Sequence, residues 1–94
     1  MPDSFRIFET DRFIKDLDGD FSGQKTRIKK KLSDQVYPAL RKQPYYGPNI
    51  KKLADYTPPT WRYRIGDYRF FYTINADEKT VFMLKIHKRD DAYK

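Results

Sequence analysis

The stretch Trp61–Asn75, WRYRIGDYRFFYTIN, decides the fold of this chain. Its residues alternate on both sides of Gly66-Asp67, a dipeptide typical of a two-residue hairpin turn that takes glycine first. Because successive strand side chains point to opposite faces, the stretch predicts a β-hairpin with two unlike faces. The apolar face carries Trp61, Tyr63, Ile65, Tyr68, Phe70, Tyr72 and Ile74. The opposite face, named the arginine face below, carries Arg62, Arg64, Arg69, Phe71 and Thr73.

The segments before the hairpin predict one strand and two helices. Residues 4–9, SFRIFE, are rich in strand-forming residues, and Thr10 or Asp11 can cap a short helix that ends at Asp18-Gly19. Ser22 is a plausible cap for a second helix. Apolar residues recur there every four positions and predict a buried stripe with a basic outer side: Ile28, Leu32, Val36 and Leu40. Pro38 lacks a backbone N–H, so we expect this helix to kink or restart near Tyr37.

The remaining segments predict a connector and a last strand. Prolines and glycines punctuate residues 43–60, which indicates an ordered loop. Residues 80–87, TVFMLKIH, predict a largely buried strand. If Phe82, Leu84 and Ile86 face the core, Lys85 and His87 share the arginine face. This arrangement requires an odd turn or a bulge between Ile74 and Phe82.

Residues 1–94 are therefore expected to form a single α+β domain. The N-terminal strand and a two-helix hairpin should pack on an antiparallel sheet of about four strands.

Composition narrows the possible functions. A formal net charge of +7 suits an anionic partner such as nucleic acid, a membrane surface or an acidic protein. No cysteine and a single histidine exclude disulfides and an ordinary zinc site, and the acidic pairs lack calcium-loop spacing. The first residues, MPDSFRIFETD, have no apolar region after a basic start, so we expect no secretion signal. No apolar run approaches the roughly 20 residues that span a bilayer. We expect neither a metal nor another cofactor.

The basic residues of the hairpin and the chain end could form a phosphate site. Guanidinium groups match phosphate oxygens bidentately, and Phe71 could stack on a base. Arginines on exposed strand positions are also common on solvated sheets. His87 alone is better explained as a structural or solvent-facing histidine than as a catalyst, and Tyr93 alone as an aromatic that packs down near the chain end. The run 29–31, Lys-Lys-Lys, is either a solvated helix side or a contact to a nucleic-acid backbone.

Four stretches together resemble the RelE/ParE superfamily of toxins from toxin–antitoxin systems. They are FRIFETDRFIKDL (5–17), NIKKL (49–53), WRYRIGDYRFFYTI (61–74) and IHKRDDAY (86–93). The resemblance implies a RelE-like fold and a cytoplasmic protein held silent by a cognate antitoxin, with no membrane partner. It further implies a metal-free endoribonuclease that cuts mRNA on the ribosome. In that reaction a ribose 2′-hydroxyl attacks the adjacent phosphate and leaves a 2′,3′-cyclic phosphate and a 5′-hydroxyl.

The resemblance also implies roles for individual residues. Arg62 and Arg64 match two basic residues of the family's active strand, and Arg69 matches an arginine that grips the scissile phosphate. The closing motif supplies Arg89 (or Lys88, if the gap is placed differently) and the C-terminal tyrosine, Tyr93. Some family members have lysines where this chain has Arg62 and Arg64. Arginine holds its proton too tightly to be an easy base, so the base role passes to His87 or the reaction depends on charge stabilisation and geometry.

The candidate catalytic residues are therefore Arg64, Arg69, His87, Arg89 and Tyr93, and the candidate substrate-binding residues are Arg62, Lys85, Lys88 and Phe71. Two other functions stay open. ParE-like members of the superfamily inhibit DNA gyrase without nuclease activity. A module that binds RNA or an acidic protein without any chemistry would have the same composition.

Overall fold

The computed structural model describes residues 4–19 and 25–88. Its elements are β1 (Arg6–Glu9), α1 (Asp11–Asp18), α2 (Lys25–Lys31), the π-helical turn η1 (Leu32–Val36), α3 (Tyr37–Lys42), β2 (Ile50–Lys52), β3 (Trp61–Ile65), β4 (Tyr68–Asn75) and β5 (Thr80–Lys88). None of the helices in these ranges has the length and apolar character needed to cross a membrane. The predicted cap Ser22 lies outside the described residues.

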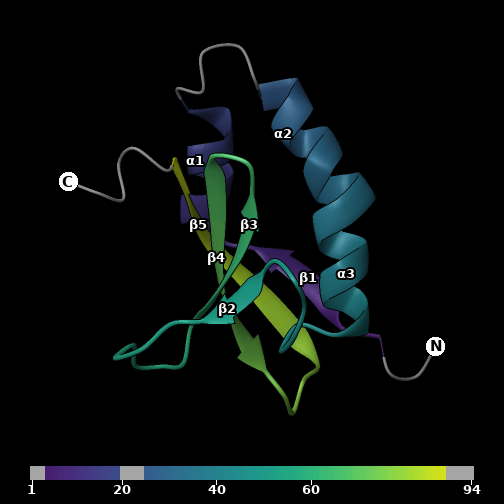
Figure 1. The fold of residues 1–94 in the computed structure, drawn as a ribbon, viewed down its shortest axis with the longest axis vertical. Helices are drawn as coiled ribbons and strands as arrows, with labels where there is room; N and C mark the ends of the chain where they lie inside the picture. The colour runs from purple at the N-terminus through teal and green to yellow at the C-terminus, as the bar shows by residue number, and fades with distance from the viewer. Residues whose placement is uncertain (1–3, 20–24, 89–94) are drawn as a thin grey trace.

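The strands form one mixed sheet with the order β1-β5-β4-β3-β2 (Figure 1). β1 runs parallel to β5, and the other neighbours are antiparallel. The predicted α+β architecture is confirmed. The sheet has one strand more than the expected number of about four, because Ile50–Lys52 of the connector pairs with β3.

The predicted hairpin is confirmed in its turn and in its faces. Ile65 pairs with Tyr68 across Gly66-Asp67, and Gly66 has a φ of +54°, in the left-handed region that glycine tolerates best. The predicted apolar face packs into the core, where Tyr72 is fully buried and its hydroxyl donates to the Pro44 carbonyl at 2.7 Å.

The helices cover the apolar face of the sheet. Thr10 caps α1 by accepting the Phe13 N–H at 3.3 Å, and Gly19 ends the helix, as predicted. α2, η1 and α3 run on as one rod beside the sheet (Figure 1). Of the kink or restart expected near Tyr37, the structure shows a restart: α3 begins at Tyr37, directly after the π-turn. In this turn the Tyr37 N–H donates to the carbonyl of Leu32, five residues back.

The core joins one stripe of each helix to the covered sheet face. Its members are Phe13, Leu17, Ile28, Leu32, Val36, Leu40, Trp61, Tyr63, Phe70, Tyr72, Val81, Met83 and Ile86. The stripe predicted from the four-residue spacing, Ile28 to Leu40, is entirely buried. The arginine face therefore lies on the side of the sheet opposite to this core.

The predicted core residues of β5 were partly wrong. Val81 and Met83 face the core, whereas Phe82 and Leu84 are only half-buried and Phe82 packs edge-on against Phe8. A bulge is present, but at Leu84 instead of between Ile74 and Phe82: β4 pairs Phe71 with Lys85 and then Tyr72 with Met83. The extra residue reverses the alternation, so that Ile86 is again in the core.

Replacing Gly66 by Ala is expected to lower the free energy of unfolding by about 1–2 kcal/mol, because a Cβ is unfavourable at a left-handed φ. No atom lies within 4 Å of the position that this Cβ would take, so the loss is conformational. Urea denaturation measures it. Gly66→Asn should lose less, since asparagine tolerates this region, and an Ala variant as stable as the wild type would contradict the assigned turn.

Stability should also fall in alkali through Tyr37. Burial first, and then the hydrogen bond from its hydroxyl to the Glu9 carboxylate, raise the pKa of Tyr37 above its ordinary value. A group whose pKa is raised by folding stabilises fully below its unfolded pKa, about 10 for tyrosine, and loses this contribution as the pH rises further. Urea denaturation at about pH 8 and about pH 11 should therefore show a smaller alkaline loss in Tyr37→Phe than in the wild type.

The control is Tyr46→Phe, because Tyr46 is 75% exposed. Equal alkaline losses in Tyr37→Phe and in this control would rule out the contribution of Tyr37.

Candidate functional site

The basic side chains of the arginine face lie in two adjacent rows across the sheet. Arg64 pairs with Arg69, and Arg69 pairs with His87, so one row crosses β3, β4 and β5. Cross-strand neighbours of this kind have Cβ atoms about 5 Å apart. The structure thus brings two predicted guanidinium groups and the imidazole into one line.

The second row is built on Phe71. Arg62 pairs with Phe71, and Phe71 pairs with Lys85. β2 extends this row, because Lys51 pairs with Arg62 and is exposed. The sequence analysis did not name Lys51 as a site residue. Lys51 belongs to the segment NIKKL (49–53), which was predicted to be part of a loop and not a strand that pairs with β3.

Phe71 is the buried floor of the site. Its side chain is 6% exposed, with the Lys85 Nζ 5.1 Å from the ring centroid and the His87 ring centroid also 5.1 Å away. The predicted stacking of Phe71 on a base would require these two neighbours to move. In the structure Phe71 instead supports the basic groups from below.

The cations affect one another electrostatically. Partial burial, and then the positive charges of Arg69 and Arg64, lower the pKa of Arg62 from its ordinary value. Arg64 is exposed, and its Nε donates a long 3.5 Å hydrogen bond to the Gly66 carbonyl. A surface with several like charges this close favours an anion that neutralises them.

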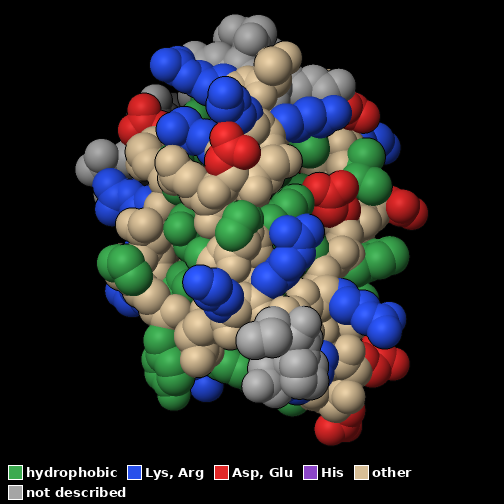
Figure 2. Space-filling view, turned by 90° about the vertical axis from the view of Figure 1, so that its right-hand side faces the viewer, with side chains coloured by type: hydrophobic (Ala, Val, Ile, Leu, Met, Phe, Trp, Pro, Cys, Tyr) green, Lys and Arg blue, Asp and Glu red, His purple; other side chains and the backbone are tan. Residues whose placement is uncertain are grey.

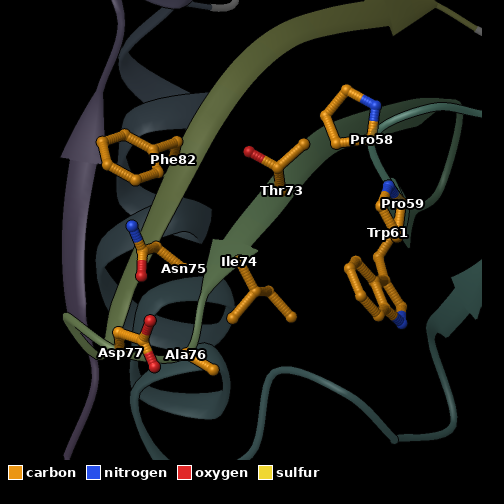
Figure 3. A pocket seen from close by; sticks show the side chains of 9 residues that line it. All are labelled: Pro58, Pro59, Trp61, Thr73, Ile74, Asn75, Ala76, Asp77 and Phe82. Carbon is orange, nitrogen blue, oxygen red and sulfur yellow. The ribbon is translucent and has the colours of Figure 1, made fainter.

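A cavity of about 440 Å³ lies where the arginine face ends. It is lined by Pro58, Pro59, Trp61, Thr73, Ile74, Asn75, Ala76, Asp77 and Phe82 (Figure 3). Thr73 and Ile74 point to opposite sides of β4 in this view, as successive residues of a strand do. The pairing of β4 with β3 ends at Trp61 and Tyr72, so the edge of β4 is open beyond this pair. The cavity therefore reaches around an open strand edge beyond the second basic row.

The predicted site also includes residues at the chain end, and most of these lie outside the described residues. Lys88 pairs with Tyr68 through its backbone, beside the Arg69–His87 pair. Its side chain, and the whole of Arg89 and Tyr93, lie outside the described residues.

A second basic surface lies away from the arginine face, on α2. Lys29 and Lys30 are exposed there. Figure 2 views the molecule from the side of α2 and α3, and Lys and Arg side chains gather near its top, where α2 lies. The predicted basic outer side of this helix is confirmed.

A sheet with helices on one face is the fold that the resemblance to the RelE/ParE superfamily implied. A sequence model of one of its families, described as ParE toxin of type II toxin–antitoxin system, parDE, matches residues 7–93. The chain belongs to this family. No curated protein matches it.

Solved structures of RelE toxins share the fold. RelE in the RelBE2 toxin–antitoxin complex of Mycobacterium tuberculosis is 23% identical, with a TM-score of 0.73 over 92% of each chain. RelE in the RelE–RelB complex of the archaeon Pyrococcus horikoshii is 22% identical, with a TM-score of 0.67 over 92% of this chain and 96% of that one. A mutant of Escherichia coli RelE in the free state is 20% identical, with a TM-score of 0.65 over 96% and 88%.

Like-charge repulsion in the arginine face should reduce stability. Arg64→Gln is expected to raise the melting temperature slightly at about 10 mM salt and to lose this advantage at about 1 M, where the Debye length is near 3 Å. Thermal unfolding followed by circular dichroism measures the difference. Lys42→Gln, at the exposed end of α3, is the control and should not stabilise, because a lysine there favours the helix dipole.

A stabilisation of Arg64→Gln that persisted unchanged at high salt would contradict an electrostatic cause.

Proposed function

We propose that this toxin is a metal-free endoribonuclease that cleaves mRNA on the ribosome. The observation that supports this most directly is the row Arg64–Arg69–His87, which sets two guanidinium groups beside an imidazole on an open sheet face. An RNA backbone laid across this row would have one phosphate within reach of all three groups.

The arginines would stabilise the transition state. When a 2′-oxygen bonds to phosphorus, negative charge grows on the non-bridging phosphate oxygens. Guanidinium groups fixed beforehand at this position interact more strongly with that charge than with the ground-state diester, and this lowers the barrier. Arg69 is the central group, because it has a basic or imidazole neighbour on both adjacent strands.

Proton transfer would depend on His87 and the chain end. The attacking 2′-hydroxyl must lose a proton, and the departing 5′-oxygen must gain one. Imidazole exchanges protons readily near neutral pH, whereas guanidinium does not. We assign the base role to His87 and a role at the leaving oxygen to the closing motif, Arg89 and Tyr93, on the resemblance to the family.

Lys51, Arg62 and Lys85 would hold the neighbouring phosphates. They form the second row, one strand repeat of about 6.7 Å along from the first. This is close to the spacing of successive phosphates in a single strand. The same row would give RNA affinity a steep dependence on salt.

We further propose a cognate antitoxin as the physiological partner. The toxins of the structures from Pyrococcus horikoshii and Mycobacterium tuberculosis are each solved in a complex with an antitoxin. The net charge of +7 makes an acidic antitoxin segment a favourable match.

Inhibition of DNA gyrase is the second candidate. It is favoured by the family match, since the family is that of ParE toxins. In this case the arginine face would be a binding surface, and expression would cause DNA damage while mRNA stayed intact.

Primer extension on cellular mRNA after brief induction of the chain tests the first candidate. We expect discrete cuts within translated codons, and at least about a hundredfold loss of cutting in Arg69→Ala, the effect of removing one stabilising donor from a transition state. Arg69→Lys is the matched variant: it keeps the charge but loses the planar fork, and should retain part of the activity.

Growth arrest with intact mRNA would overturn the nuclease in favour of gyrase inhibition. Intact mRNA with normal growth would overturn both and leave a binding module. Full cutting by a folded Arg69→Ala variant would show that the scissile phosphate lies elsewhere.

A further inference from the structure

The bulge at Leu84 determines where Lys85 and His87 point. Val81 and Met83 face the core, so uninterrupted alternation would also turn Lys85 and His87 into the core and leave Ile86 outside. The extra residue prevents this: Ile86 is buried against Phe70, and Lys85 and His87 lie beside Phe71 and Arg69. The contacts that hold the bulge in place therefore also fix Lys85 and His87 in the candidate site.

The first half of β5 is held by strands on both sides, but the second half is not. β1 pairs with β5 only as far as Glu9 and Met83. At Thr10 the chain turns into α1, and this helix takes over contact with the free side of β5. The backbone N–H of Thr10 donates to the Met83 carbonyl at 3.1 Å.

The side chain of Thr10, which caps α1, and that of Asp16, within α1, bond the backbone of β5. The Thr10 hydroxyl lies 2.7 Å from the Met83 carbonyl oxygen and 3.4 Å from that of Leu84. Beyond the bulge, the Ile86 N–H donates to the Asp16 Oδ2 at 3.0 Å. The other carboxylate oxygen of Asp16 accepts from the Arg12 Nε at 3.3 Å.

We propose that Asp16 is a positioning residue of the candidate site. Its carboxylate replaces a strand partner for Ile86 and thereby fixes the backbone from which the His87 side chain projects. Asp16 touches no substrate itself and acts only through the backbone of Ile86 and the residue that follows it. The catalytic consequence rests on the proposed ribonuclease function, but the geometric claim does not.

Two variants of the same shape test the role of the acceptor. Asn and Leu both match the shape of Asp, and only Asn can still accept the Ile86 N–H. In Asp16→Leu, amide exchange at Ile86 measured by NMR should be at least about tenfold faster, the effect of losing one hydrogen bond to a charged group. The His87 ring resonances and their titration with pH should shift as well. Asp16→Asn should stay close to the wild type in both readouts.

Arg12→Ala is the control for the ion pair. It removes the other contact of Asp16 and leaves the Ile86 bond in place, so it should not move the His87 resonances. If Asp16→Leu does not fold, Asp16→Ala removes the same acceptor with less bulk and carries the same expectation. Unchanged Ile86 exchange and unchanged His87 resonances in a folded variant without the acceptor would overturn the proposal.

Activity gives a separate readout. If the nuclease is confirmed, Asp16→Leu should lower kcat about tenfold and change KM by less than about twofold, because misplacement affects the reacting geometry more than binding. Asp16→Asn should restore kcat. If the protein proves not to be a nuclease, only this activity test is lost, because the NMR measurements need no RNA.

Discussion

One extra residue in β5, Leu84, determines which side chains of this strand enter the core and which lie on the arginine face. On one side of it Val81 and Met83 complete the core, and on the other Ile86 does so again, with Lys85 and His87 turned to the opposite face. Without the bulge, two basic side chains would be buried without acidic partners, at a cost of several kcal/mol each. The same feature thus serves stability and the composition of the arginine face.

The two faces of the sheet keep apart a packed apolar core and a cluster of like charges. The covered face is apolar and tightly packed, and it supplies the rigidity. The open face gathers cations that repel one another, and partial burial, followed by the charges of Arg69 and Arg64, lowers the pKa of Arg62. Repulsion of this kind is relieved when an anion neutralises the cations.

Local patterns predicted much of this fold. The alternation around Gly66-Asp67 predicts the hairpin and both of its faces, and the four-residue spacing from Ile28 to Leu40 predicts the buried helix stripe. These features depend on neighbours a few residues apart. The strand Ile50–Lys52 is too short to alternate visibly, and its evidence is pairing with β3, so it and the contribution of Lys51 were missed.

The sequence also predicted the wrong position for the bulge in β5, for a similar reason. The side chains that bond the backbone of β5 before and after Leu84 belong to Thr10 and Asp16, about 70 positions away in the chain. No local pattern records such bonds. The presence of Lys85 and His87 on the arginine face was nevertheless predicted, because it follows by alternation from Ile86 facing the core, and that part of the prediction holds.

The chemical form of the cut ends tests the proposed mechanism most directly. Purified toxin would be incubated with programmed ribosomes and mRNA, and the new 3′ and 5′ ends would be identified. We predict a 2′,3′-cyclic phosphate and a 5′-hydroxyl, because the 2′-oxygen of the RNA is the nucleophile and arginines supply the positive charge. A 5′-phosphate end would contradict that mechanism, because it would show that water or another outside nucleophile had attacked the phosphate.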